Sequence, residues 1–242
     1  MKYAILGDIH ANIEALQAVL HKCRELGVDK YLCIGDLVGY NASPRECVEL
    51  VRSMNMEVVL KGNHDEQATA GTRLAGFNPQ AAMAIEWTRQ QLTDDQCGWL
   101  SALPMLKNLG AKMTVVHATL DMPEKWGYIF DPLTAAASLH YQFTQLCFFG
   151  HTHVPLAFDK FGDVKGGPFE EVRIQAGHKY MINCGSVGQP RDGDPRASFI
   201  TYAPDENLVR LYRVEYDIAS TQQRIRQAGL PERLWQRLAL GR

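Results

Sequence analysis

The sequence predicts an α/β fold, and three observations support this prediction. Short apolar runs alternate with amphipathic helical patterns over the first sixty residues, in the order strand, helix, strand, helix, strand. This alternation is typical of parallel strands joined by crossover helices. Beyond residue 154 the chain becomes rich in short strands joined by turns. Polar side chains also follow several of the apolar runs, at the strand ends where α/β proteins commonly bind ligands.

The first part of the chain supplies three strands and two helices. The strands are expected at three apolar runs, residues 2–6, 31–34 and 57–60. Apolar residues at helical spacing predict a helix over 12–26, with Gly27 as its end. The stretch Ser43-Pro44-Arg45-Glu46 combines a capping box with a proline at the first helical position. It predicts a second helix, which ends near Met54.

The middle of the chain changes to helical patterns. Residues 66–112 are predicted to form a helical insertion beside the sheet, with helix starts at Asn78-Pro79 and at a capping box over 93–96. Two further strands are expected at apolar runs, residues 113–116 and 146–149. Asp131-Pro132 predicts the start of a helix between them.

The last third of the chain is predicted to be mainly strands. They are expected at residues 155–159, 171–175, 179–185, 197–203 and 209–216. A hairpin turn is expected at 205–207. Apolar residues at helical spacing within Arg224–Arg242 predict a terminal helix packed on the body, in preference to a membrane or partner helix. No repeat or linker divides the sequence, so a single domain over 1–242 is expected.

Composition excludes several classes of protein. Hydrophobic residues make up 46% and charged residues 21%, which is typical of a globular protein and excludes disorder. The 25 Lys and Arg residues nearly balance the 27 Asp and Glu residues, so charge gives no sign of nucleic-acid binding. Six cysteines without a C-x-x-C pair predict buried, reduced thiols and a cytoplasmic location. No secretion signal and no apolar run of membrane-spanning length is present, and the oligomeric state is not predicted.

Five apolar runs end in a cluster of Asp, Asn or His residues. The clusters are Asp8 and His10, Asp36, the trio Asn63, His64 and Asp65, His117, and the pair His151 and His153. Four of them follow a glycine, which allows a sharp turn and a close approach of the backbone. A single Asp-x-His would be read as a loop or cap, but five ordered clusters indicate a site. The remaining histidines, His21, His140 and His178, are expected to be structural or solvated.

The residue types in these clusters favour metal binding. Mixed imidazole, carboxylate and amide ligands suit Mn, Fe, Zn, Co or Ni better than Mg or Ca. The set fits two adjacent divalent metals, and a carboxylate between two cations could bridge them. The absence of clustered cysteines argues against a structural zinc site.

The ordered motifs D-x-H, G-D, G-N-H-D, H and G-H-T-H, from Asp8 to His153, resemble those of the calcineurin-like metallophosphoesterase superfamily. The stretch NCGSVGQPRDGDPRASF, residues 183–199, resembles its small bacterial and archaeal phosphodiesterase branch. The resemblance implies a four-layer α-β-β-α sandwich with two central mixed sheets and a dinuclear site at one rim. It implies two divalent transition-metal ions, with Mn or Fe favoured. The implied ligands are Asp8, His10 and His153 for one ion, Asn63, His117 and His151 for the other, and Asp36 as the bridge.

The resemblance also implies an activity. A metal-dependent phosphoesterase would hydrolyse a phosphodiester or nucleotide-type phosphate ester through a metal-bridging hydroxide. His64 would face the substrate and protonate the leaving oxygen, and Asp65 would accept from its ring N–H and favour the imidazolium. Arg191 lies in a Gly- and Pro-rich loop, where it either forms a turn or surface ion pair or binds a substrate phosphate.

Other functions remain open at this level. The run GDLVGYNAS after the second strand lacks the arginine that the protein Ser/Thr phosphatase and symmetrical dinucleoside tetraphosphatase branches carry there. A small phosphodiester or nucleotide is therefore favoured over a phosphoprotein. The alternatives are a non-catalytic metal-binding scaffold and a slow nucleotide-binding regulator with the same fold. The sequence identifies neither the natural substrate nor the metal.

Overall fold

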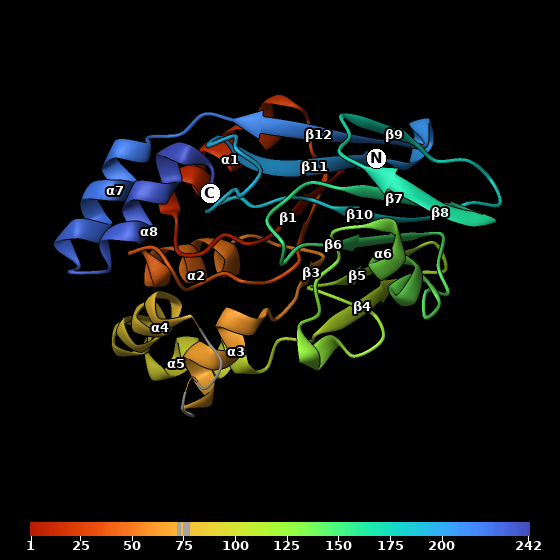
Figure 1. Cartoon of the computed structure of the whole chain (residues 1–242). Coiled ribbons are helices and arrows are strands. Elements are labelled where there is room, and N and C mark those ends of the chain that lie inside the picture. The colour runs from red at the N-terminus through yellow and green to blue at the C-terminus, as the bar shows by residue number, and fades with distance from the viewer. Residues whose placement is uncertain (72–73, 75–77) are drawn as a thin grey trace.

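Two six-stranded sheets form the centre of the protein and pack face to face (Figure 1). The computed structural model describes residues 1–71, 74 and 78–242. The first sheet contains, in spatial order, β3 (Val58–Val59), β2 (Lys30–Cys33), β1 (Tyr3–Leu6), β11 (Ala197–Ala203), β12 (Leu208–Val214) and β9 (Glu171–Arg173). The second sheet contains β4 (Leu106–Leu109), β5 (Met113–Val116), β6 (Leu146–Phe149), β10 (Lys179–Asn183), β7 (Ala157–Phe161) and β8 (Asp163–Gly167).

Both sheets mix parallel and antiparallel strands. β1, β2 and β3 run parallel, as the alternation of strands and helices predicts, whereas β11, β12 and β9 form antiparallel pairs. In the second sheet β5, β6 and β10 run parallel, and β4, β7 and β8 pair antiparallel with their neighbours. Ile5, Phe148 and Ile182 belong to the fully buried cluster that both sheets share. This layer of side chains is the central core.

Helices cover the outer face of each sheet (Figure 1). α1 (Ile13–Glu25) and α2 (Pro44–Ser53) pack on the first sheet, and α6 (Pro132–Leu139) packs on the second. Leu16 of α1 and Phe199 of β11 are both fully buried in the outer core that results. The structure therefore confirms the predicted four-layer α-β-β-α sandwich with two central mixed sheets.

The first two helices begin and end close to the predicted residues, but one predicted cap is wrong. Asn12 caps α1 by accepting from the backbone N–H of Ala15. Ser43 precedes α2 and Pro44 occupies its first position, yet the Ser43 side chain makes no capping hydrogen bond. The backbone of Ser43, with ψ of 52°, lies outside the extended region from which a serine side chain reaches back to the helix N–H groups.

The predicted insertion 66–112 is helical only in part among its described residues, which exclude 72–73 and 75–77. α3 (Asn63–Ala70), α4 (Pro79–Gln91) and α5 (Asp94–Ser101) lie together beside α2, at one end of the molecule (Figure 1). Asn78 caps α4, and Thr93 and Gln96 form the predicted capping box of α5. After Ser101, however, the chain enters β4 of the second sheet. The strand was missed because its centre, Lys107-Asn108, is polar and exposed.

The C-terminal segment also departs from its prediction. The single helix expected within Arg224–Arg242 is broken into α7 (Ile218–Gln227), α8 (Glu232–Gln236) and the 3₁₀ turn η3 (Arg237–Leu240). The break follows from Gly229, which has φ of +68°, and from Pro231, which has no N–H to continue a helix. Packing on the body is confirmed, because Ile225, Leu234 and Leu238 are buried with residues of α4.

The remaining connections bear out smaller predictions. Asn207, with φ of +50°, completes the expected hairpin turn between β11 and β12 after the 3₁₀ turn η2 (Pro204–Glu206). A second 3₁₀ turn, η1 (Pro123–Lys125), lies between β5 and α6. All six cysteines are free, and five are buried. Within residues 1–71, 74 and 78–242, no helix has the length and apolar content needed to cross a membrane.

Candidate metal centre

The polar clusters of five chain segments meet at one end of the sheets. Asp8 and His10 follow β1, Asp36 follows β2, Asn63 begins α3 just after β3, His117 follows β5, and His151 and His153 follow β6. Each of these side chains is buried, and Asn63 is the most exposed at 8%. The ligand atoms form two groups, each within 4.8 Å, that share one carboxylate: Asp8, His10, Asp36 and His153, and then Asp36, His117 and His151.

Three of the histidines have one ring N–H fixed by the backbone. Their Nδ1 atoms lie next to main-chain oxygens, at 3.0 Å for His10 and Val38, 2.9 Å for His117 and Ile34, and 2.6 Å for His153 and Gln189. A carbonyl oxygen only accepts, so each Nδ1 carries the hydrogen and donates it. In the neutral form of each ring, Nε2 then directs a lone pair into the cluster. This is the usual arrangement of histidines that bind a metal.

The lone pairs converge too closely to be left without a positive charge. Nε2 of His10 and Nε2 of His153 lie 3.0 Å apart. Two lone pairs at this distance repel unless a proton or a cation lies between them. Asp36 Oδ2 lies 3.5 Å from Nε2 of His10 and 3.4 Å from Nε2 of His117, so it faces both groups.

The second group also gathers potential metal ligands around Asp36. Asn63 Oδ1 lies 3.3 Å from Nε2 of His117. Nε2 of His151 is buried and has no hydrogen-bond partner among the described residues. The set of imidazole nitrogens, carboxylates and one amide oxygen therefore fits two divalent transition-metal ions that share Asp36.

Burial and charge give the imidazoles different protonation states. Burial lowers the pKa of His151 to about 3, and it lowers the pKa values of His10 and His153 well below the usual value, so all three are neutral at pH 7. Burial also acts to lower the pKa of His117, but the charge of Asp36 overcomes it and raises that pKa to about 9. Burial alone would raise the pKa of Asp36, yet the neighbouring imidazoles hold it well below its usual value.

Metal binding at this site is expected to be stronger at higher pH. The metal-free protein carries a proton on His117 below pH 9, and that proton must leave Nε2 before a cation binds there. Between pH 7 and 9 the apparent affinity for Mn(II) should therefore rise about tenfold per pH unit and then level off. Titration against a chelator at several pH values measures this slope. An affinity that is constant from pH 7 to 9 would show that His117 releases no proton.

The backbone at the cluster is strained. Five cluster residues have positive φ, namely Asp8 at 52°, His10 at 48°, Asp36 at 54°, His151 at 67° and His153 at 61°. Residues with a side chain rarely adopt this conformation, and it gathers at functional sites. The predicted role of the glycines also fits. A Cβ on Gly62 would lie 2.1 Å from Asp36 Oδ1, and one on Gly150 would lie 2.3 Å from Asp8 Oδ2.

Asn63, His64 and Asp65 form the first turn of α3 rather than a strand end. Successive helical side chains diverge by about 100°, which sends the three to different targets. Asn63 approaches His117, and His64 lines the pocket over the cluster. The N–H of His64 also donates to Asp36 Oδ1 at 2.8 Å.

Asp65 makes contacts that differ from the predicted one with the His64 ring. Its Oδ1 accepts from the N–H groups of Leu37 and Val38, and its Oδ2 accepts from the N–H of Gly62. The carboxylate therefore ties the loop after Asp36 to the start of α3. Burial lowers the pKa of His64 to about 4, so its resting form is the neutral imidazole and not the predicted imidazolium.

A pocket of about 220 Å³ opens onto the cluster. Arg191, whose position the sequence left open, lines this pocket with its guanidinium carbon 5.4 Å from the centre of the Tyr40 ring. Trp126 and Tyr128, from the loop between β5 and α6, were missed as lining residues. Their only signal in the sequence is the aromatic-rich run WGYIF, residues 126–130.

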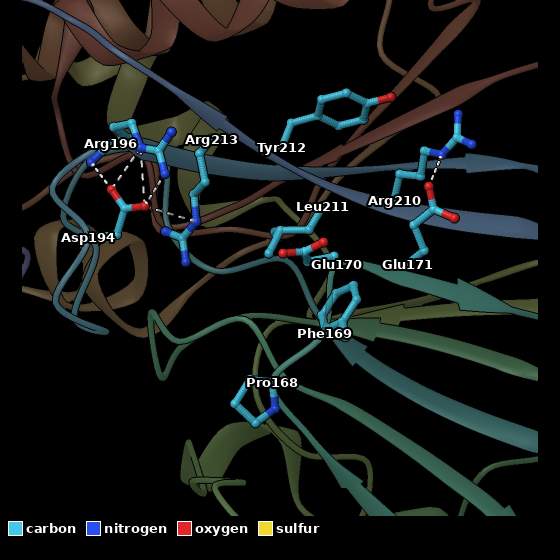
Figure 2. Close-up of a pocket in the computed structure, with 10 residues that line it drawn as sticks. All are labelled: Pro168, Phe169, Glu170, Glu171, Asp194, Arg196, Arg210, Leu211, Tyr212 and Arg213. Atoms are coloured by element: carbon cyan, nitrogen blue, oxygen red, sulfur yellow. Dashed lines mark hydrogen bonds and ion pairs between the residues drawn. The ribbon is translucent and has the colours of Figure 1, made fainter.

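A second groove and two of the remaining histidines lie outside this site. A wider groove of about 740 Å³ runs along β12 and β9, and it contains the ion pairs Arg196–Asp194 and Arg210–Glu171, which Figure 2 shows. His21 is exposed on α1, and His178 pairs with Asp159 at 2.8 Å. The buried cluster and its pocket are therefore where the reactive groups converge.

A four-layer sandwich with buried His and Asp side chains at the strand ends defines a class, that of α/β proteins whose clustered side chains could hold metal ions. A family model, the calcineurin-like phosphoesterase superfamily domain, matches residues 1–207. A metallophosphoesterase from Sphaerobacter thermophilus is 43% identical, with a TM-score of 0.89 over 100% of this chain and 99% of that one. The chain belongs to the calcineurin-like phosphoesterase superfamily.

Two further proteins are similar over nearly the whole chain. An uncharacterized protein of Methanocaldococcus jannaschii is 38% identical over 245 residues, which cover 99% of this chain and 98% of that one. A hypothetical protein from Pyrococcus horikoshii has a TM-score of 0.81 at 21% identity over 100% and 98%, a likeness of fold alone. The resemblance inferred from the motifs is confirmed, and membership of the family indicates a hydrolase that acts on phosphate esters.

Proposed function

We propose that this protein is a dinuclear metal-dependent phosphoesterase that hydrolyses a phosphodiester or nucleotide-type phosphate ester. The proposal rests on one observation: the Nε2 atoms of His10 and His153 lie 3.0 Å apart, and their lone pairs face each other. A cation between them removes the repulsion. Asp36, which faces these rings and His117, provides the link to a second cation.

The ligands divide between two ions. Asp8, His10 and His153 would hold one, Asn63, His117 and His151 the other, and Asp36 both, with Mn or Fe favoured as the metal. These residues would hold the two ions, which would supply an acidified water and neutralise charge on phosphoryl oxygens. The neutral imidazoles are already in the form that binds a metal, because burial keeps their pKa values low.

The other residues of the pocket act on the ester. His64 is neutral in the empty pocket, but the negative charge of a bound phosphoryl group raises its pKa. The protonated ring then donates to the leaving oxygen as the bond to phosphorus breaks. Arg191 donates to phosphoryl oxygens from its planar fork. Asp65 acts as a positioning residue, because it holds the loop that carries Asp36.

The shape of the pocket favours a small ester. Its walls include Tyr40, Trp126 and Tyr128, and its volume of about 220 Å³ suits a compact phosphate ester with a planar group. The run that contains Tyr40 lacks the arginine typical of protein phosphatases. A phosphoprotein substrate is therefore less favoured.

The test is metal content together with hydrolysis. Protein loaded with Mn(II) is expected to hold about two ions per chain and to hydrolyse bis-p-nitrophenyl phosphate or p-nitrophenyl phosphate, whereas chelator-treated protein is inactive. Two bound ions without turnover of either ester would favour the metal-binding scaffold. Turnover confined to natural nucleotides, at a very low rate, would favour the nucleotide-binding regulator. A protein that binds no metal would overturn the proposal.

A further inference from the structure

Two aromatic side chains form a flat surface beside the pocket. The rings of Tyr128 and Phe130 are nearly parallel, with an angle of 4° between their planes and 5.8 Å between their centres. Each of these residues is 53% exposed, although aromatic side chains stabilise a protein most when they are buried. We call the two rings the aromatic platform.

The aromatic platform begins at the proposed metal centre. Tyr128 lines the pocket, and its ring centre lies 4.3 Å from that of His151, with an angle of 32° between the two planes. Phe130 is not one of the lining residues, so it extends the platform from Tyr128 toward the outside. A planar group that is linked to a phosphoryl group at the metal centre would therefore reach Tyr128 first and Phe130 second.

The platform is held in place on both sides of Tyr128. On one side, Nε1 of Trp126 donates to Glu66 Oε2 at 3.1 Å, which ties the loop to α3. On the other side, Ile129 is buried in the apolar cluster that includes Leu139 of α6. Because these contacts exist before a ligand binds, little conformational entropy is lost when a group stacks on the rings.

A small planar group suits this surface better than a protein partner does. A protein that covered the exposed face of Tyr128 would also lie over the mouth of the pocket and keep a substrate from the metal centre. A planar group that belongs to the substrate itself covers the same ring and leaves the phosphoryl group in the pocket. The continuity of the platform with the pocket therefore favours the substrate as its occupant.

Resting on the proposed function, we propose that Tyr128 and Phe130 form a stacking subsite for a planar aromatic group of the phosphate ester. The substrate class is then an ester that carries a nucleobase or an aryl ring, in preference to an aliphatic ester such as a sugar phosphate. The phosphoryl group lies at the metal centre, and the planar group lies across the platform. Stacking requires only a flat π face, so the platform selects an aromatic group and not one particular base.

Binding of hydrolysis-resistant phosphonates tests this subsite. The first pair of probes is the phosphonate analogue of adenosine monophosphate, with a methylene group in place of the ester oxygen, and the same compound without its base. At saturating Mn(II), calorimetry should show that the wild-type protein binds the analogue with the base more tightly. Phe130→Ala should weaken that probe about 5- to 150-fold, the range for loss of one base–aromatic stack, and leave the base-free probe nearly unchanged.

A second pair of probes, phenylphosphonate and methylphosphonate, distinguishes the two kinds of planar group. Tighter binding of the compound with the base assigns a nucleotide to the platform. Tighter binding of phenylphosphonate alone, lost in Tyr128→Ala, assigns an aryl ester. Tyr128→Phe keeps the ring and should bind the preferred probe like the wild-type protein. If the planar group gave no advantage in either pair, the subsite would be overturned.

Phe143→Ala is the matched control, because it removes the same side chain from a position that is 96% exposed and does not line the pocket. It should bind all four probes like the wild-type protein. The subsite would also be overturned if Phe130→Ala and Tyr128→Ala bound every probe like the wild-type protein, or weakened both members of a pair equally. Unchanged probe binding with an altered oligomeric state, seen by light scattering, would make the rings an interface between copies instead.

Two further measurements keep the test decisive. Metal content and melting temperature identify a variant that fails to fold. If Phe130→Ala does so, Phe130→Leu decides, because it keeps an apolar side chain without a flat ring. Absence of metal-dependent hydrolysis would overturn the proposed function alone, since the comparison of probes measures binding.

Discussion

Replacing Asp36 by asparagine is expected to eliminate hydrolysis and to lower the metal content. The carboxylate is fully surrounded by the cluster, and its Oδ2 faces His10 and His117. Asparagine has nearly the same shape, and its Oδ1 can still accept from the N–H of His64, so the loop should keep its fold. What is lost is the negative charge between the two groups of ligands. Removing a residue that only hydrogen-bonds to a metal ligand typically lowers activity by roughly 10- to 100-fold. The loss in kcat on replacing Asp36 should be larger.

The pKa of His117 gives a second readout of Asp36→Asn, which depends on the lost charge and not on folding. Asp36 is the principal cause of the raised pKa of His117 in the metal-free protein. In Asp36→Asn this pKa should fall, and any remaining metal binding should therefore depend less on pH between 7 and 9 than in the wild-type protein. Asp159→Asn is the control, because Asp159 also pairs with a histidine but lies outside the site. Full metal content and full turnover in Asp36→Asn would contradict the assignment of a bridging carboxylate.

The convergence of the proposed ligands was predictable because each cluster follows an apolar run. Parallel strands such as β1 and β2 end at the same edge of a sheet. The residues that directly follow them therefore lie close together, regardless of the conformation of the loops. Asp8 and Asp36 are examples, and each sits one residue beyond a glycine. The second group needed the resemblance to a family, because His117 is a single histidine with no motif around it.

The predictions that were wrong or missing concern contacts between distant residues, which no local sequence pattern encodes. β4 and β8 pair at the edges of the second sheet, and their sequences, LKNL and DVKGG, have little intrinsic preference for strands. The C-terminal segment folds back because Gly229 and Pro231 break it, and the N–H of Gly193 then donates to the main-chain oxygen of Gly241. The partners of Asp65 are backbone N–H groups of a different loop, which a side-chain pattern cannot reveal.

Replacing His64 by glutamine is expected to lower kcat by about 10² to 10⁴ while both metals remain bound. The ring lines the pocket, but it belongs to neither group of ligand atoms. Glutamine keeps a side chain of similar length that can donate a hydrogen bond, yet it cannot transfer a proton at neutral pH. The variant should therefore bind Mn(II) like the wild-type protein and fail in the chemical step.

The pH dependence gives the sharper readout of His64. Its pKa of about 4 in the empty pocket rises when an anionic substrate binds, and only the protonated ring can donate to the leaving oxygen. In the wild-type protein kcat should therefore fall as pH rises through that elevated pKa, and this decline should be absent in His64→Gln. His21→Gln, at an exposed position on α1, should reproduce the wild-type profile. Loss of metal from His64→Gln would instead make His64 a metal ligand. If the decline of kcat with rising pH were unchanged in His64→Gln, another group would be the proton donor.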